Sequence, residues 1–332
     1  MAKLAPAVTP VSVPRVPPFR AAPSCSRRLA HPVSPSRFQA SSSDTLVSSP
    51  DHVHPIVVNI EHTDCFGMVF YGNYFRFMEE ARESLFGGSS SLAAARRRIR
   101  LLSISSAKWA ASARLGDVLR VRTTIISEES STCDSGDGDE RVVNLEQVVE
   151  NTDGKTFMAA SATCRVAHED DSWNTNVVAD EINDSKLDDA DVDFSATVPY
   201  CVGTSDVDAS GCINEVAVMR AFERGRTACL GVSSSTDDAS NDASNGASTL
   251  MALQEAGVLV VVTRMKDFCY VGAPPRYGRE LIAQTSCRTS AAGAKLDFHQ
   301  WLECASTGAT VARANVTCLC VGEDGRRRRL PI

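Results

Sequence analysis

Residues 62–86 place an acidic residue and a glycine three positions apart, Asp64 and Gly67, before an aromatic stretch and an amphipathic segment. A carboxylate can activate water as a general base. Free backbone N–H groups at the start of a helix can hold an oxyanion. The spacing therefore indicates a site at which a carboxylate and amide donors act on the same group.

The residues that follow Asp64 predict the helix that would supply those donors. Tyr74, Met78, Ala81 and Leu85 recur at the spacing of one helical face. Such a stripe is typical of a buried amphipathic helix. Asp64 then lies before the end of the helix where N–H groups lack partners and the dipole is positive. An aspartate there is also a common helix N-cap, which is the structural alternative to catalysis.

The same pattern returns 144 residues later, in residues 208–230. The identical pairs of the ungapped alignment are Asp64 with Asp208, Gly67 with Gly211, Arg76 with Arg220, Glu79 with Glu223 and Arg82 with Arg226. Solenoid repeats have periods of about 20 to 50 residues, so this repeat is far too long for a solenoid. We therefore predict a duplicated domain.

Composition limits the classes of protein that fit. The 332 residues are 43% apolar and 23% charged, which suits about two globular domains. No apolar run reaches the length of a membrane span. The net charge is −7, and residues 1–43 hold basic residues but no acid, so the remainder is more acidic still. This charge argues against nucleic acid or an anionic membrane as a partner.

The cysteines give no sign of a metal site. There are twelve, with no Cys-x-x-Cys pair and no Cys/His cluster at zinc spacing. Scattered cysteines of this kind are usually buried small residues in a reducing compartment. We expect no metal, no cofactor and no disulfide framework. Cys65 has no histidine placed in the sequence as its base.

The first 43 residues resemble an organelle transit peptide. They contain eight Pro, eight Ser and six Lys or Arg, and the first acid is Asp44. The prolines prevent a long amphipathic helix, which favours the plastid stroma over the mitochondrion. A disordered tail is the alternative, but it would not explain the absence of acid.

The rest of the chain divides into two similar parts. We predict a first domain over 53–169, an acidic linker over 170–195 and a second domain over 196–325, with a low-complexity insertion at 233–248. Each domain reads as a strand, a long helix and then β-rich segments. In the first strand, Ile56, Val58 and Ile60 alternate. The run from Asn151 to Gly154 is a hairpin-turn signal.

These motifs resemble the hotdog-fold thioesterases, most closely the 4-hydroxybenzoyl-CoA thioesterase-like branch. The resemblance is carried by D64-C-F-G67-M-V-F-Y71-G-N73-Y74, E80-A-R82 and A113-R-L-G-D117, and more loosely by D208-A-S-G211 and E223-R-G-R226. It implies an α+β fold of two tandem hotdog domains, each an antiparallel sheet of five or six strands wrapped around a long central helix. The two domains would form an internal pseudo-dimer, and further homo-oligomers are compatible with it.

The resemblance also implies an activity, the hydrolysis of an acyl thioester carried by CoA or acyl carrier protein. Asp64 would be the nucleophile or general base, and the N–H of Tyr71 the oxyanion donor, with Gly67 shaping the turn. Asp208 and the Glu215 N–H would be their equivalents. Because the Glu215 carboxylate can hinder an oxyanion, one live site and one structural relic is one arrangement, and two active sites is the other. The acyl group is either aromatic or fatty.

Several nearby residues have a structural interpretation that we prefer. His62 is expected to be a satisfied loop histidine, and Arg96–Arg98 a solvated basic face. Glu79, Glu80 and Glu223 are expected to pair with Arg82 or Arg226 three positions away on the helix rather than to supply a second catalytic acid.

Two other functions stay open at this point. One is a catalytically inactive hotdog module that binds acyl thioesters or a partner. The other is a hotdog hydratase or dehydratase, although those enzymes use a histidine that neither D-x-x-G segment provides. Plant acyl-ACP thioesterases keep a histidine shortly after the aspartate, where this chain has Met68 and Cys212.

Overall fold

The computed structural model describes residues 51–64, 67–86, 99–131, 140–166, 192–208, 211–231, 253, 255–290, 293–322 and 324–330. The proposed transit segment, the low-complexity insertion, Cys65 and Arg96–Arg98 lie outside these residues, as does most of the acidic linker. The predicted domain boundaries stay predictions.

Both halves of the chain contain the same elements in the same order. The first half has β1 (His52–Val57), a 3-10 turn (Ile60–His62), α1 (Asn73–Phe86), β2 (Ile99–Trp109), β3 (Val118–Ser131), β4 (Glu140–Asn151) and β5 (Thr156–Val166). The second half has β6 (Phe194–Cys201), a 3-10 turn (Thr204–Asp206), α3 (Glu215–Cys229), β7 (Val258–Tyr270), β8 (Glu280–Thr289), β9 (Lys295–Cys304) and β10 (Thr310–Gly322).

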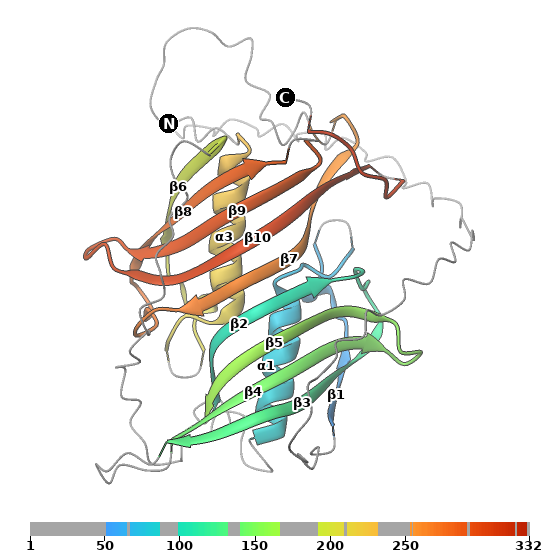
Figure 1. The fold of residues 1–332 in the computed structure, drawn as a ribbon, viewed down its shortest axis with the longest axis vertical. Helices are drawn as coiled ribbons and strands as arrows, with labels where there is room; N and C mark the ends of the chain where they lie inside the picture. The colour runs from blue at the N-terminus through green and yellow to red at the C-terminus, as the bar shows by residue number, and fades with distance from the viewer. Residues whose placement is uncertain are drawn as a thin grey trace, which may run out of the picture. The chain divides into compact units, whose positions relative to one another are not determined.

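The strands form one antiparallel sheet in the order β1-β3-β4-β5-β2-β7-β10-β9-β8-β6. The order is symmetric about the β2–β7 pair, in which Ile104 lies opposite Phe268. Each half therefore contributes five strands, and the two sheets join edge to edge (Figure 1). The prediction of two tandem hotdog domains in an α+β fold is confirmed.

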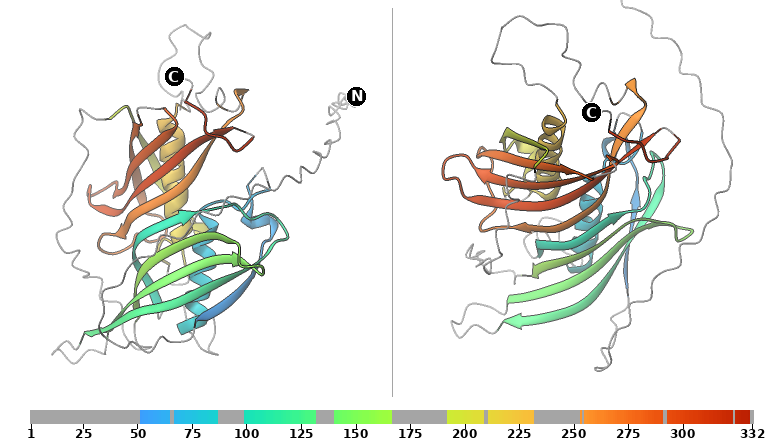
Figure 2. Two further views of the ribbon diagram at one scale, coloured as in Figure 1. Left: turned by 45° about the vertical axis from the view of Figure 1, so that its right-hand side comes forward. Right: turned by 45° about the horizontal axis from the view of Figure 1, so that its top comes forward.

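Each helix packs against the strands of its own half, as the two turned views also show (Figure 2). On α1, three residues of the predicted stripe, Tyr74, Met78 and Ala81, are at most 1% exposed, whereas the fourth, Leu85, is half-exposed near the end of the helix. Phe75 and Phe77 are buried as well, so the apolar face is wider than predicted. The sheet curves around the helix and contacts it from β1, β2, β3 and β4, which explains the wider face.

One predicted strand boundary is wrong. The alternation of the first strand fails at Ile60, which is 74% exposed because the strand ends at Val57 and a 3-10 turn begins at Ile60. Residues 110–117 form the turn between β2 and β3, with Gly116 at φ +84°. The Asn151–Gly154 turn is confirmed: the Gly154 N–H donates to the Asn151 carbonyl at 3.1 Å, and the Asn151 N–H donates to the Lys155 carbonyl at 3.0 Å.

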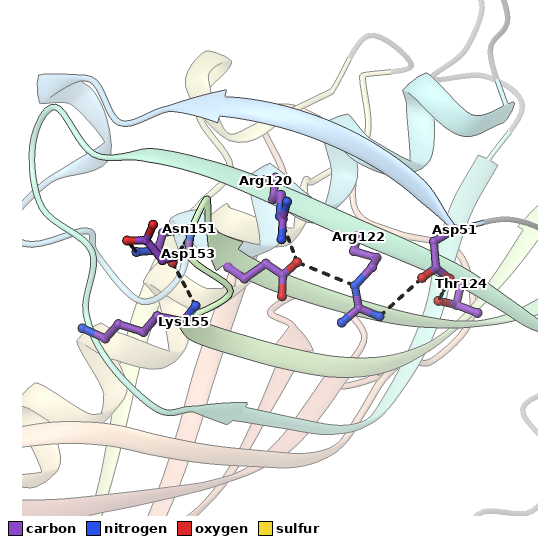
Figure 3. A network of polar contacts seen from close by, with 8 residues as sticks. Asp51, Arg120, Arg122, Thr124, Asn151, Asp153 and Lys155 are labelled. Carbon is purple, nitrogen blue, oxygen red and sulfur yellow. Dashed lines mark hydrogen bonds and ion pairs between the residues drawn. The ribbon is translucent and has the colours of Figure 1, made fainter. Parts of the chain in front are cut away.

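The outer face of the first half carries a polar network far in sequence from the D-x-x-G motif (Figure 3). Glu150 on β4 accepts from Arg120 Nε at 2.9 Å and lies 3.7 Å from Arg122 Nε. Asp51 extends the network to Arg122 and Thr124. Glu150 is buried, but the side chains of Arg120, Arg122 and Asp51 are 38–41% exposed, so these pairs are expected to contribute little to stability.

The second helix approaches its sheet more closely than the first. Gly225 occupies the position that Ala81 has in α1. A Cβ added at Gly225 would lie 2.2 Å from Thr285 Oγ1, which is held by Gln300 Nε2 at 3.0 Å. A glycine is therefore required there by packing.

We expect Gly225→Ala to lower the free energy of unfolding by about 1–3 kcal/mol, as overpacking does. This loss should outweigh the helix propensity gained with alanine, roughly 0.5–1 kcal/mol. Urea titration of the variant measures the loss. In a Thr285→Ala background the same substitution should cost less, because the clashing oxygen is gone. Equal costs in the two backgrounds would contradict the close approach.

Candidate functional site

The first D-x-x-G segment is a tight turn held by its own backbone. The Asp64 N–H donates to the Met68 carbonyl at 2.8 Å, and the Gly67 N–H donates to the Asp64 carbonyl at 3.0 Å. Gly67 has φ +68°, a left-handed conformation that favours glycine. The Asp64 carboxylate is exposed, and its Oδ1 accepts from the Met68 N–H at 3.2 Å.

The second segment reproduces this turn. Asp208 N–H donates to the Cys212 carbonyl at 2.8 Å, and Asp208 Oδ1 accepts from the Cys212 N–H at 3.2 Å. Gly211 has φ +78°. Asp208 is half-buried whereas Asp64 is exposed. The two aspartates therefore share a backbone setting but differ in their surroundings.

A second loop braces each turn. Val69 donates its N–H to the Ala113 carbonyl, and Ile213 donates to the Pro275 carbonyl, both at 2.8 Å. The next loops, residues 114–117 and 276–279, bond to the end of the first strand region of their half: the Gly116 N–H donates to the Val58 carbonyl, and the Gly278 N–H donates to the Val202 carbonyl, both at 2.9 Å. Each aspartate turn is thus held in place by a loop that lies far from it in the sequence.

Tyr71, the predicted oxyanion donor, lies between the turn and α1. The Phe70 N–H donates to the His62 carbonyl at 3.0 Å, and α1 begins at Asn73. Among the described residues, no backbone acceptor is found for the N–H of Tyr71 or Gly72. In the second half α3 begins at Glu215, and Asn214 caps it by accepting from the Ala217 N–H at 2.8 Å. The roles of Asp64, Tyr71, Gly67 and Asp208 stay predictions.

His62 is a satisfied loop residue, as predicted. It is 6% exposed, its Nδ1 accepts from the Asn59 N–H at 3.0 Å, and its ring packs edge-on against Phe77 at 5.0 Å. Burial lowers the pKa of His62. Its ring is therefore neutral and committed to the turn.

A buried arginine from each helix reaches toward the other half. Arg82 Nη1 donates to Gln147 Oε1 at 2.9 Å, and Arg226 Nη1 donates to Gln300 Oε1 at 2.6 Å. Both glutamines are anchored to a helix carbonyl of their own half, at 3.0 Å and 2.7 Å. Because Nη1 is bonded to the glutamine of its own half, Nη2 of each arginine can bond to a residue of the other half.

The residue that each arginine meets differs between the halves. Arg82 Nη2 donates to Glu215 Oε1, forming an ion pair with side chains 3% and 9% exposed. Arg226 Nη2 donates to the Tyr71 hydroxyl, which in turn donates to the Met219 carbonyl at 2.9 Å. Burial raises the pKa of Glu215, and Arg82 opposes this shift. Each D-x-x-G turn is thus part of a composite centre completed by the other half.

We call these the Asp64 centre and the Asp208 centre. The Asp64 centre holds the Asp64 turn, Tyr71 and Arg226, and the Asp208 centre holds the Asp208 turn, Glu215 and Arg82. The ring centroids of Trp109 and Tyr71 are 5.8 Å apart, so the Asp64 centre contains two adjacent aromatic side chains. The Asp208 centre has a charged residue where the first has Tyr71.

The predicted ion pairs along the helices hold only in part. Glu223 pairs with Arg226 at 2.5 Å, as expected. Glu80 pairs instead with Arg76, four positions earlier, at 3.1 Å. Arg82 has its ion pair across the interface. Sequence spacing identifies neighbours on one helix, but it does not place Glu215, 133 residues away, beside Arg82.

The sequence carries one signal for these buried arginines. Arg82 and Arg226 align in the repeat and lie on the apolar side of their helices, and a buried arginine needs acceptors. Gln147 and Gln300 stand in strands among apolar residues and serve as those acceptors.

Within the residues that the structure describes, no three His, Cys, Asp or Glu side chains are grouped so as to hold a metal ion. No helix in that part of the chain is long and apolar enough to cross a membrane. Burial raises the pKa of Cys164 and Cys318 to about 12, so neither forms a thiolate nucleophile near neutral pH.

A ten-stranded antiparallel sheet made of two five-stranded halves, each around one helix, is a double-hotdog fold. A protein described as an oleoyl thioesterase from Lactobacillus plantarum superposes with a TM-score of 0.54 at 10% identity, over 83% of this chain and 98% of its own. The 12:0-ACP thioesterase from Umbellularia californica superposes with a TM-score of 0.52 at 13% identity, over 84% of this chain and 94% of its own. No family model matches the sequence, and no curated protein does. The structural likeness establishes the fold, and the reaction has to be argued from the site.

Proposed function

We propose that this protein hydrolyses an acyl thioester to a free acid and a thiol. The observation that carries the proposal is the Asp64 turn. It holds a carboxylate in a fixed backbone geometry, in the segment that leads through Tyr71 into α1, and the Tyr71 N–H has no backbone acceptor among the described residues. A base and an amide donor are the two groups that thioester hydrolysis requires.

In the general-base form of the reaction, the Asp64 carboxylate takes a proton from water while the water oxygen attacks the carbonyl carbon. The Tyr71 N–H stabilises the negative oxygen that develops. The C–S bond then breaks, and the thiolate leaves and takes up a proton. In the nucleophilic form, Asp64 Oδ attacks first and water cleaves the resulting anhydride. Transfer of ¹⁸O from water into the Asp64 carboxyl group would distinguish the second form from the first.

The Tyr71 side chain supports this assignment because it fixes its own backbone. Its hydroxyl bonds to Arg226 and to the Met219 carbonyl, both from the second half. Burial raises the pKa of Tyr71 well above its usual range, so the hydroxyl stays neutral. The Tyr71 phenol is a positioning group, and the N–H is the donor.

The finer features of the proposal follow the motif. We place the first half in the 4-hydroxybenzoyl-CoA thioesterase-like branch, with an aromatic or fatty acyl group on CoA or acyl carrier protein. The basic, acid-free first 43 residues favour import into the plastid stroma, with the mitochondrion as the alternative. The two halves act as an internal pseudo-dimer, and the edge strands β1 and β6 leave room for further homo-oligomers.

The test is thiol release from a panel of acyl-CoA and acyl-ACP substrates by residues 44–332. We expect at least one aromatic or fatty acyl thioester to be cleaved. Release from none of them, with binding retained, would identify an inactive acyl-binding module. Hydration of the acyl chain without thiol release would identify a hydratase, although His62 is already committed to its turn.

A further inference from the structure

A groove of about 860 Å³ crosses five neighbouring strands of the sheet, β2, β7, β10, β9 and β8 (Figure 1). The charged residues that line it are Lys108, Arg264, Lys266, Arg288, Lys295, Asp267 and Asp297. Five cations therefore accompany two carboxylates, although the whole chain has a net charge of −7. A basic groove on an acidic protein attracts anions, and its volume is that of a site for a small ligand.

The strand register brings two of these cations together on the outer face of the sheet. Lys108 of β2 lies opposite Arg264 of β7. The adjacent pair, Ala107 with Met265, is at most 1% exposed and faces the core. Because side chains alternate along a strand, Lys108 and Arg264 both point away from the core, and so does Lys266, two residues further along β7. Like charges directly opposite one another destabilise a sheet, so this arrangement is not explained by stability.

The three cations of β2 and β7 have no acceptor in the part of the chain that the structure describes. Neither Lys108, Arg264 nor Lys266 forms a hydrogen bond or an ion pair there. Arg264 Nε is buried and has no hydrogen-bond partner. A buried donor without an acceptor costs free energy, and an anionic ligand in the groove would supply the acceptor.

Both carboxylates of the groove are engaged by other residues. Asp297 accepts from Lys295 Nζ at 2.5 Å and from Thr317 Oγ1 at 2.7 Å. Asp267 Oδ2 accepts from Asn315 Nδ2 at 3.1 Å. The carboxylates therefore leave the positive charge of the three cations of β2 and β7 uncompensated.

The outer face changes character on the other side of Lys108. There the same row of residues continues through Ala159 of β5 and Val148 of β4 to Arg122 of β3. The two middle residues are apolar, and Arg122 has carboxylate partners, among them Asp51 (Figure 3). Unpaired cations on the outer face are therefore not a requirement of the fold, because the corresponding row of the first half does without them.

We propose that this groove binds a small phosphorylated ligand with at least two phosphate charges, held by Lys108, Arg264 and Lys266. Neighbouring strands are about 4.8 Å apart and alternate residues of one strand about 6.6 Å apart, so these long side chains can reach adjacent phosphates. Arginine and lysine are both established phosphate-binding side chains.

The phosphates come either from a separate nucleotide or from CoA as the thiol carrier. Only the second source rests on the proposed function. Trp109, which lines the groove, also packs against Tyr71 of the Asp64 centre, so the two sites are neighbours.

Calorimetric titration of the full chain with pyrophosphate, ADP and CoA tests the groove. We expect binding that weakens as the salt concentration rises. Arg264→Gln should weaken it by roughly tenfold or more, as the loss of a charge-assisted hydrogen bond does, and Lys108→Gln should act in the same direction. Arg122→Gln is the matched control, because it removes a cation from the same row outside the groove, and it should leave binding unchanged.

ADP and CoA distinguish the two sources of phosphate. A groove for a separate nucleotide should bind ADP at least as tightly as CoA. A groove for the thiol carrier should bind CoA more tightly than ADP, and Arg264→Gln should then raise the KM for an acyl-CoA without changing the KM for the matching acyl-pantetheine.

Binding of none of the three probes, or equal binding by Arg264→Gln, would overturn the proposal. Sulfate that competes as well as pyrophosphate at the same ionic strength would also overturn it, because the groove would then only collect counterions. Lys108→Gln and Arg264→Gln each remove one of two opposed charges and should unfold at the same temperature as the unchanged protein or higher, so lost binding is not lost folding. ADP binding requires no thioester cleavage, so failure of this site and failure of the hydrolase proposal are distinguishable.

Discussion

Asp64→Asn is expected to lower thiol release from an acyl thioester by a factor on the order of 10² to 10⁴, the range that a general base contributes. The amide keeps the size of the side chain and an oxygen that can accept from the Met68 N–H at 3.2 Å. It removes the negative charge that accepts the proton of water. The turn should therefore persist while the chemistry stops. Steady-state thiol detection with the best substrate of the panel measures the loss.

Two variants make this result specific. Asp208→Asn changes the equivalent carboxylate in the same backbone geometry and should retain activity within about twofold if the Asp64 centre is the live one. Asp51→Asn changes a carboxylate of the outer-face network and should have no effect. Full activity in Asp64→Asn together with a loss in Asp208→Asn would move the reaction to the second half. Unchanged thermal unfolding of each variant excludes a folding defect.

The sequence was sufficient for the repeat, the helices and the fold class, because these depend on local periodicity. Tyr74, Met78 and Ala81 have the spacing of a buried face, and the structure buries them. The first strand was extended too far because Ile60 continues the alternation, whereas the Asn59–His62 hydrogen bond turns the chain. Such a turn depends on a side chain that a periodicity argument does not weigh.

The composite centres could not be read from the sequence in the same way. The repeat aligns Tyr71 with Glu215 and Arg82 with Arg226, but it does not say that each arginine crosses to the other half. The crossing depends on how the two halves pack against each other. Gly72 lies close to Met219 of α3: a Cβ added at Gly72 would be 3.1 Å from the Met219 Cβ. Contacts between elements far apart in the chain are set by tertiary packing. The sequence alone shows which types of residue are present, but not which of them meet.

The cross-half ion pair gives the second large prediction. Arg82→Met is expected to lower the free energy of unfolding by about 3–5 kcal/mol near neutral pH, because it leaves the buried Glu215 carboxylate without its partner. Methionine keeps much of the apolar volume of the arginine stem, so the loss reports on charge rather than on a cavity. Urea titration at pH 8 measures it.

The loss should depend on pH in a direction that the burial of Glu215 fixes. Burial raises the folded-state pKa of Glu215 above its unfolded value, and removing Arg82 raises it further. The variant is therefore stabilised with Glu215 protonated, and that stability is lost as the pH rises through the folded pKa. Arg82→Met should cost clearly less at pH 5 than at pH 8.

The second half supplies the matched control. Arg226→Met removes an arginine with the same glutamine support, but its partners are the neutral Tyr71 hydroxyl and Glu223, whose side chain is 43% exposed. It leaves no buried charge, so it should cost only about 1–3 kcal/mol, with little difference between pH 5 and pH 8. Adding Glu215→Leu to Arg82→Met should recover most of the lost stability, since a buried ion pair can be replaced by apolar groups at little cost. Equal losses for the two arginines at both pH values would show that Glu215 is not held as a buried charge by Arg82.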